Sequence, residues 1–296
     1  MVHTMQPNFH FKQLSQLKEE LSLLKGKYVN VIDYNIGSNI QHLYTVIDAF
    51  THSKTLGWMC EMCLETLDNE NLLKALAKSR CRIVYCGLES IEKESFASIN
   101  KAKTNQIQNY ARIIKMAQTH GIQIAAGIII GLEGATKHTI DSTFSFYQNI
   151  GVIYAKLTFL TYNPGTKVFE SMKRVGKYVE EDLRYFDGNH FTFLPKGVNQ
   201  KEVIAALGTN IKQFYSLKAI KQRALNAGTK DFGFDEFVQF NMAYRDVYLN
   251  WLKYNVFENR AGFEKLLLRK YSKNKAIREN EDRIVRTRKS RYKASL

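Results

Sequence analysis

The sequence predicts an α/β fold built around a parallel sheet or barrel. Five strand segments alternate with helices between Tyr28 and Tyr162, and the strand segments are apolar almost throughout. Strands of this kind are parallel and covered on both faces. Polar residues and glycines gather where the strands end, and the carboxyl ends of parallel strands build the ligand sites of such folds.

The elements follow one another closely along the chain. The first helix is predicted over residues 11–27, where leucines recur every three to four residues and Gly26 stands near the end. The predicted strands cover 28–33, 56–62, 82–90, 122–132 and 152–162, and the predicted helices between them cover 39–52, 68–80, 104–121 and 136–151. Asp68 is the expected N-cap of its helix, with Glu70 in the first turn. Because an α/β barrel normally begins with a strand, we expect one strand to be missing before residue 1.

The pattern changes near residue 180. Residues 182–197 read as a loop with short extended pieces, and helices are predicted over 199–225, 235–255 and 258–290. We therefore predict two parts. Residues 1–180 form an incomplete barrel, and residues 181–296 form a mainly helical C-terminal region with a basic tail.

Positive charge is concentrated in that tail. The chain has a formal net charge of +15, and residues 269–296 hold eleven Lys or Arg against three Asp or Glu. Such a tail can contact nucleic acid or another acidic surface. A helical end that is simply exposed to solvent explains the positive charge equally well. Few aromatic residues, which could stack on bases, lie among the Lys and Arg residues of the tail.

Cysteine content and apolar segments bear on the location of the protein. Four cysteines within residues 60–86 are too few and too local for the disulfide framework of a secreted fold, so a cytoplasmic setting is expected. The N-terminal residues lack the apolar run of a signal peptide. The longest apolar stretch, IAAGIIIGL, is too short to cross a bilayer, so an integral membrane protein is not expected.

Three short motifs stand at strand ends. CGLES (86–90) offers an acid and a hydroxyl, and Glu89 can accept hydrogen bonds from a ribose or an amine. GIIIGLEG (127–134) spaces glycines around a strand end, where a flat ligand can lie close to the backbone. LTYNPGT (160–166) runs from a strand into a Pro-Gly turn. Each motif alone is better explained by an ordinary cap or turn.

In this order, the motifs resemble those of the radical S-adenosylmethionine superfamily, and most of all its branch whose members often carry a cobalamin-binding domain. The resemblance covers roughly residues 10–225. It implies a partial (β/α) barrel of the radical S-adenosylmethionine type, missing its first strand here. It further implies S-adenosylmethionine across the strand ends, a four-iron four-sulfur cluster after the first strand in the intact family, and cobalamin through a preceding domain.

The same resemblance implies cofactor-binding residues but no catalytic residue. They are Asp33, Glu89, Ser90, Gly127, Ile129, Gly131 and Tyr162. Asp33 matches the first of two acids common in this branch, and Tyr34 stands in for the second. Glu89 and Ser90 would face the ribose or the amino group, and Gly127, Ile129 and Gly131 of GIIIGLEG would face adenine. Tyr162 stands where the family more usually has proline.

The stretch LGWMCEMC (56–63) does not complete a cluster motif. The family uses Cys-x3-Cys-x2-Cys, with one iron on each thiolate, and Leu56 replaces the first cysteine. On a strand, Cys60 and Cys63 would point to opposite faces and could not chelate one metal. The spacing of the four cysteines, Cys60, Cys63, Cys81 and Cys86, is near that of some zinc sites. We favour ordinary buried thiols and assign no metal ligand.

The sequence therefore predicts a radical S-adenosylmethionine protein that is inactive alone, because the cluster loop is absent. It would be a truncated or split gene product whose missing part lies upstream. Two alternatives stay open. One is a fragment completed in trans by an upstream-encoded polypeptide carrying the cluster cysteines, and the other is a basic nucleic-acid-binding protein. The sequence does not indicate a substrate.

Overall fold

The protein is described by a computed structural model. It describes residues 10–91, 107–174, 182–192, 197–228 and 234–253. Contacts along the chain define two compact units, Met1–Arg245 and Asp246–Leu296. The predicted helix at 258–290 and the basic tail at 269–296 lie outside the described residues, and the predicted boundary near residue 180 falls within another such range and stays a prediction.

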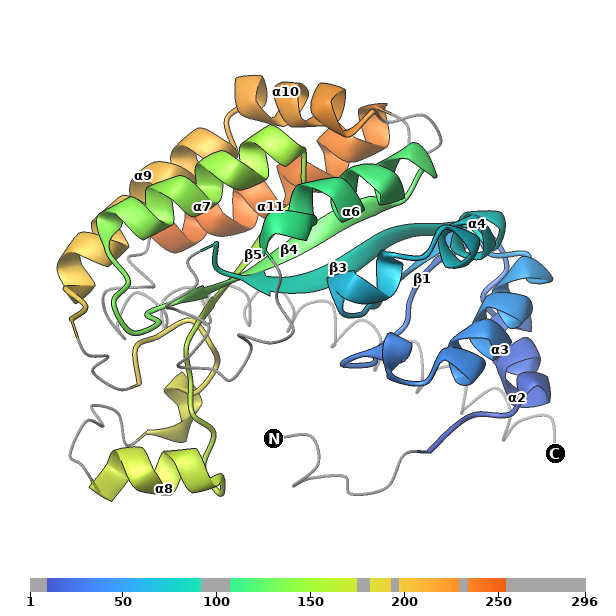
Figure 1. Cartoon of the computed structure of the whole chain (residues 1–296), viewed down its shortest axis with the longest axis horizontal. Coiled ribbons are helices and arrows are strands. Elements are labelled where there is room, and N and C mark those ends of the chain that lie inside the picture. The colour runs from blue at the N-terminus through green and yellow to red at the C-terminus, as the bar shows by residue number, and fades with distance from the viewer. Residues whose placement is uncertain (1–9, 92–106, 175–181, 193–196, 229–233, 254–296) are drawn as a thin grey trace, which may run out of the picture. The chain divides into compact units, whose positions relative to one another are not determined.

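A five-stranded parallel sheet forms the centre of the first unit (Figure 1). The strands are β1 (Tyr28–Asn30), β2 (Gly57–Glu61), β3 (Cys81–Glu89), β4 (Gln123–Ile130) and β5 (Ala155–Phe159). They lie side by side in sequence order, and every neighbouring pair is parallel. With its surrounding helices the sheet curls into a half-barrel, which confirms the predicted α/β partial barrel.

Helices connect successive strands, as the alternating sequence pattern predicts. The bounds are α2 (Leu14–Ser22), α3 (Ile40–Thr51), α4 (Glu70–Lys78), α6 (Ile107–Thr119), α7 (Lys137–Ile150), α8 (Lys167–Arg174), α9 (Gln200–Phe214), α10 (Leu217–Ala227) and α11 (Phe234–Lys253). Short 3-10 turns are η1 (Ile36–Ser38), η2 (Leu64–Leu67) and η3 (Leu183–Tyr185). The sequence pattern predicts the Pro-Gly turn before α8 but does not predict the helix itself.

Two details of the helices differ from the predictions. The N-cap of α4 is Asn69, whose side chain accepts a hydrogen bond from the Leu72 amide, and not Asp68. Asp68 instead ends η2 and forms an ion pair with Arg112, 2.6 Å away. The segment 199–225 is divided into α9 and α10, because the side chain of Ser216 caps a new helix start.

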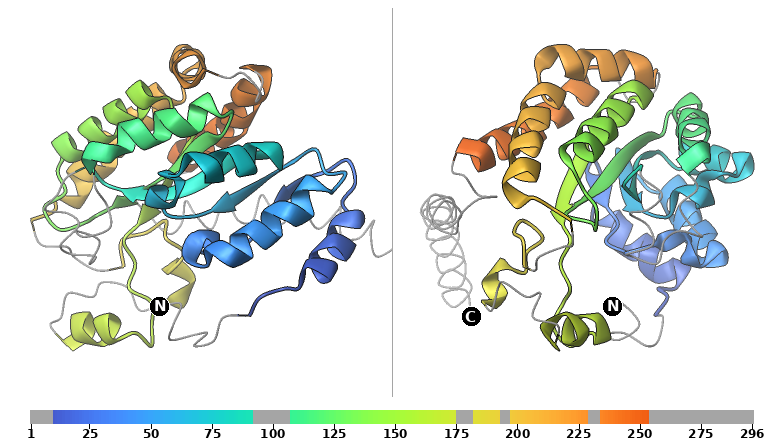
Figure 2. Two further views of the ribbon diagram at one scale, coloured as in Figure 1. Left: turned by 45° about the vertical axis from the view of Figure 1, so that its right-hand side comes forward. Right: turned by 60° about the vertical axis from the view of Figure 1, so that its left-hand side comes forward.

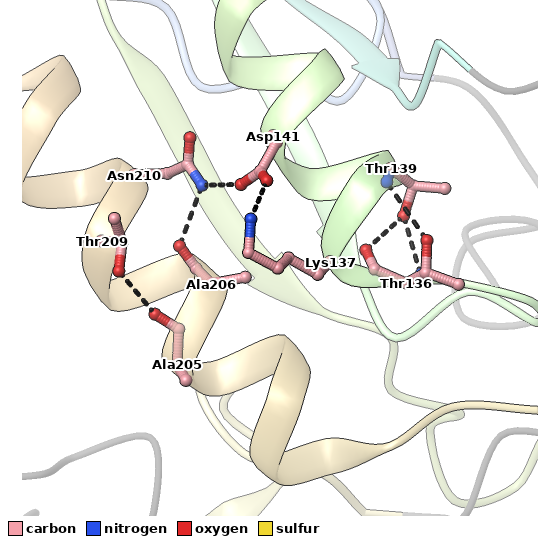
Figure 3. Close-up of polar contacts among 8 residues, drawn as sticks. All are labelled: Thr136, Lys137, Thr139, Asp141, Ala205, Ala206, Thr209 and Asn210. Carbon is pink, nitrogen blue, oxygen red and sulfur yellow. Dashed lines mark hydrogen bonds and ion pairs between the residues drawn. The ribbon is translucent and has the colours of Figure 1, made fainter.

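Helix α7 is capped and fastened to α9 by polar side chains (Figure 3). Thr136 and Thr139 form a capping box at its start, which satisfies amides that have no partner within the helix. One turn on, Asp141 pairs with Lys137 and accepts a hydrogen bond of 2.6 Å from Asn210 on α9. This bond fixes the position of α9 along α7.

The two faces of the sheet are covered differently. We call the face that carries Tyr85 and Gly127 the inner face, and the opposite face the outer face. Helices α4 and α6 pack on the outer face against β3 and β4. Helix α11 lies on the other side of the sheet, as Figure 2 shows. Its Phe237 is buried with Ile83 and Ala125 of the inner face, so apolar burial holds the helix there.

The covering of the inner face stops part of the way along the strands. Tyr154, just before β5, stacks on Tyr244 of α11 with ring centroids 4.1 Å apart. Two residues further on, Lys156 is exposed, and Thr158 is half-buried. The other three residues of β5, which alternate with them, are buried. The inner face is therefore packed near the strand starts and open near the strand ends.

A buried arginine joins the helices around this packed region. Arg223 of α10 is fully buried and donates hydrogen bonds to the carbonyl of Val152 at 3.2 Å and to Gln148 Oε1 at 3.0 Å. It also donates to Asn241 Oδ1 on α11 at 2.5 Å and to the carbonyl of Phe214. The Phe214 ring lies 3.6 Å from the guanidinium carbon. Burial lowers the pKa of Arg223 to about 9, so the side chain is cationic at neutral pH.

No helix in the described part of the chain is both long and apolar enough to cross a membrane.

Replacing Arg223 should destabilise the fold strongly. Arg223→Met keeps most of the side-chain length but leaves buried oxygens without donors, so we expect the free energy of unfolding to fall by about 3 kcal/mol. Urea unfolding followed by circular dichroism measures this change. Arg174→Met, in the exposed last turn of α8, is the matched control and should change stability by less than about 0.5 kcal/mol. Equal stability of the two variants would contradict the assignment.

Candidate functional site

The end of β3 is held in an unusual backbone conformation. Glu89, its last residue, has φ 63°, a left-handed value that costs a non-glycine residue about 1–2 kcal/mol. The register between β3 and β4 shifts just before it, between Cys86 and Glu89. The Ser90 amide then donates to the Leu88 carbonyl at 2.7 Å, and Ser90 is buried. Backbone strain of this kind is concentrated at functional sites.

The middle of β4 is arranged around a glycine. A Cβ atom on Gly127 would overlap the hydroxyl oxygen of Tyr85, so the tyrosine side chain crosses the inner face at this glycine. From α7, Tyr147 donates to the Gly127 carbonyl at 3.1 Å. Burial raises the pKa of Tyr147 well above its usual value, so its hydroxyl stays a donor. The space beside Gly127 is therefore occupied by the Tyr85 side chain.

A second glycine stands where β4 ends. Gly131 has φ 84°, and a Cβ there would lie 2.6 Å from the Phe191 ring. Phe191 also packs edge-on against Phe159, with ring centroids 4.8 Å apart. The Gly188 carbonyl accepts a hydrogen bond of 2.6 Å from the Phe159 amide. Residues 188–191 therefore lie over the ends of β4 and β5.

Ile129 and Tyr162 are brought together by a small apolar cluster. Both pack against Leu132 and Leu160, which are buried. Burial raises the pKa of the Tyr162 phenol, so the ring is neutral at physiological pH. The cluster forms an apolar contact between the β4 and β5 ends, as a flat ligand at this edge would require.

Asp33 lies apart from this group. It follows β1, where it is exposed and accepts a hydrogen bond of 3.0 Å from the Asn35 amide. Two neighbouring strands are about 4.8 Å apart, and β2 separates β1 from β3. The structure therefore brings together the predicted residues of β3, β4 and β5, with Glu89 paired to Ile128 in register, and leaves Asp33 at the sheet edge.

Three residues near these positions were not predicted from the sequence: Tyr85 and Lys156 on the inner face, and Phe191 beside Gly131. Period-two alternation in RIVYCGLES places Tyr85 and Glu89 on one face of a strand, so that signal was present in the sequence. Lys156 lies on the same face as Gly127 because β4 and β5 pair in that register. A local sequence pattern does not predict the register between two strands.

A histidine and an aspartate pair beside the strand ends. His190 is 7% exposed, and its Nδ1 lies 3.0 Å from Asp187 Oδ1. Burial raises the pKa of Asp187, but hydrogen bonds from His190 and Asn189 outweigh it and leave the pKa below its usual value. Asp187 is therefore ionised at neutral pH and orients the imidazole.

The four cysteines are distributed unequally. Cys60, Cys81 and Cys86 are buried, as expected. A hydrogen bond with Cys81, together with burial, raises the pKa of Cys60 well above its usual value, and burial raises that of Cys86. Cys63 is exposed, which corrects the expectation of a buried thiol, because β2 ends before it and the side chain meets Asn35 instead. In the described residues, no three His, Cys, Asp or Glu side chains are grouped to hold a metal.

A cavity of about 360 Å³ lies at the opposite end of the strands. Its walls come from the starts of β1, β2 and β3 and from α11, with Trp58, Met59 and Phe240 among them. None of the predicted site residues lines it. The candidate site is therefore the open strand-end region of the inner face, at the carboxyl edge of the strands of this parallel half-barrel.

Comparison of the sequence with known proteins finds methyltransferases. The chain is 24% identical over 166 residues to bacteriochlorophyllide d C-12(1)-methyltransferase of Chlorobaculum tepidum, a match that covers 56% of this chain and 36% of that protein. It is 29% identical over 157 residues to an uncharacterized methyltransferase of Pyrococcus horikoshii, covering 51% and 34%. The match therefore spans about a third of these relatives. No family model matches the chain.

Solved structures of radical enzymes share the fold. The radical S-adenosylmethionine methyltransferase TsrM from Kitasatospora setae superposes with a TM-score of 0.55 at 12% identity, over 79% of this chain and 55% of that one. The cobalamin-dependent S-adenosylmethionine radical enzyme OxsB gives 0.52 at 10% identity, over 88% and 46%. The resemblance that the motifs indicate is thus confirmed, and the solved structures show that it extends to the fold.

The strain at Glu89 can be measured. Because glycine adopts a positive φ without cost, Glu89→Gly should be more stable than Glu89→Ala by about 1 kcal/mol. Comparing these two variants cancels whatever the glutamate side chain itself contributes. The same pair at Glu133, which has an ordinary backbone, should show no advantage for glycine. Urea unfolding of the four variants checks the order, and equal preferences at both positions would contradict the strain.

Proposed function

We propose that the strand-end region binds S-adenosylmethionine as part of a radical S-adenosylmethionine protein. The observation that carries the proposal is the strained Glu89, in register beside the β4 residues that precede Gly131. A carboxylate kept in a costly conformation suits a residue selected for a ligand contact. Glu89 and Ser90 then contact the ribose or the amino group, and Ile129 and Tyr162 contact the adenine ring.

The residues present fit a nucleoside in part. The apolar cluster against which Ile129 and Tyr162 pack, and the acid at Glu89, are suited to a base and a ribose. The spaces beside Gly127 and Gly131 already hold Tyr85 and Phe191. We therefore assign Gly131 to adenine through its backbone at the strand end, and Gly127 acts through the tyrosine that crosses it. Asp33 would act from the β1 edge.

The cysteines of this chain do not fit a four-iron cluster. Three of the four thiols are buried on the sheet, and only Cys63 is exposed. Such a cluster requires three or four accessible thiolates close together. We propose that the cluster ligands lie on another polypeptide or another part of the protein, and that residues 1–296 alone do not cleave S-adenosylmethionine reductively.

Methyl transfer is the reaction class that the comparisons favour. The two curated relatives named above are methyltransferases, and so is TsrM. In such a protein, S-adenosylmethionine supplies the methyl group or the radical. The role proposed for this chain is to hold the nucleoside at the strand ends and the acceptor on the open inner face. The basic tail, which motivates a nucleic-acid-binding alternative, is outside the described residues, and no described contact favours that alternative.

Ligand binding tests the proposal directly. Isothermal titration should show that the full chain binds S-adenosylmethionine, and that Glu89→Ala weakens binding roughly 10- to 100-fold, the effect of losing a charge-assisted hydrogen bond. Glu202→Ala, which removes an exposed acid in the first turn of α9, is the control and should bind as the unchanged protein does. Absence of binding, or equal loss in both variants, would contradict the site.

The cluster proposal has its own measurement. After anaerobic reconstitution with iron and sulfide and reduction with dithionite, the chain alone should show no electron paramagnetic resonance signal of a reduced four-iron four-sulfur cluster. Addition of an upstream-encoded polypeptide that carries Cys-x3-Cys-x2-Cys should produce that signal and bring S-adenosylmethionine cleavage with it. A four-iron signal from the chain alone would show that its own thiols ligate a cluster.

A further inference from the structure

We propose that Lys156 binds a carboxylate on the open half of the inner face. The proposal rests on the proposed function, because it takes the open face to be where an acceptor lies beside S-adenosylmethionine. It assigns to that face a ligand chemistry that neither the motifs nor the comparisons indicate.

The position of Lys156 is the first reason. In β5 it is exposed between two buried residues, so its side chain points away from the packed outer face. Its register partner is Gly127, and Ile129 pairs with Thr158 two residues on. Lys156 therefore shares a face with the predicted adenine contacts, just beyond the point where the aromatic residues of α11 stop covering it.

The second reason is that the ammonium group is held in place. Lys156 Nζ lies 5.2 Å from the centroid of the Tyr85 ring. That ring is fixed in turn, because Tyr85 packs at the edge of the apolar cluster under α11 and its hydroxyl reaches Gly127. A cation over an exposed ring gains about 0.5–1 kcal/mol, which orients the ammonium but leaves its N–H groups available. Gly127 makes this arrangement possible, since any side chain there would displace the tyrosine.

The third reason concerns charge. Among the described residues Lys156 takes part in no ion pair, whereas Lys12, Lys74 and Lys137 each pair with an acid. An ammonium over a ring and beside an open face is a point charge suited to an anion.

The neighbouring acids decide which anion fits. Glu61 is the register partner of Tyr85 on the same face, and Glu89 ends the same strand as Tyr85. Glu61 and Glu89 give this face negative charge of its own, so a doubly charged phosphate is less favourable there than a single negative charge. A monoanionic carboxylate therefore fits this position, and it belongs either to the acceptor substrate or to the amino-acid part of S-adenosylmethionine.

The test observes the lysine itself. The full chain is prepared with lysine labelled with ¹³C at Cε, and the Lys156 signal is assigned from its loss in Lys156→Arg. Sodium benzoate should shift this signal to saturation, with a Kd of about 1–10 mM for one charge-assisted contact. Benzamide, the neutral isostere, should not shift it when ionic strength is matched with sodium chloride. Lys212, exposed on α9 and assigned in the same way, is the control lysine.

A second step separates the two sources of the carboxylate. If S-adenosylmethionine displaces benzoate and 5′-methylthioadenosine does not, the carboxylate is that of the cofactor. If S-adenosylmethionine binds without displacing benzoate, the site is left for the substrate. Equal effects of benzoate and benzamide, or equal shifts of Lys156 and Lys212, would overturn the proposal. If S-adenosylmethionine does not bind, the proposed function is contradicted. The benzoate titration would still decide whether Lys156 binds a carboxylate.

Discussion

The hydrogen bonds of Arg223 are the constraint on which the arrangement around the sheet depends. One buried guanidinium donates hydrogen bonds to three separate segments: the loop between α7 and β5, the end of α9, and α11. Because its acceptors are uncharged carbonyl and amide oxygens, the cation is stable only while all of these segments stay in place. Its burial therefore couples the helices to one another as well as to the sheet.

That coupling determines which part of the inner face can bind a ligand. With α11 held in place, Phe237 and Tyr244 pack over the starts of β3, β4 and β5, next to the cavity at the starts of β1, β2 and β3. In the half nearest the strand ends, Lys156 is exposed, Glu89 and Thr158 are half-buried, and the backbone is strained at Glu89. The packed half thus supports the half that carries the candidate site.

The sequence predicts the strand ends well, because apolar runs and the glycines that follow them are local signals. It therefore locates Glu89 and Gly131 at the carboxyl edge of the sheet. It does not predict what covers a glycine, since the contact of Tyr85 with Gly127 depends on how β3 and β4 are aligned. The burial of Arg223 could not be predicted from the sequence either. In the pattern of α10 it looks like any surface cation, and only the packing of three further segments makes it a core residue.

The exposed thiol at the end of β2 has a practical consequence. Cys60, Cys81 and Cys86 are buried, and the pKa values of Cys60 and Cys86 are raised as well, so these thiols react slowly with electrophiles. Of the four cysteines, Cys63 alone is exposed. A maleimide fluorophore or spin label would therefore attach to the native protein at one place, near the carboxyl edge of the sheet. Labelling would need no cysteine to be removed, and the attached probe would report on events at the mouth of the half-barrel.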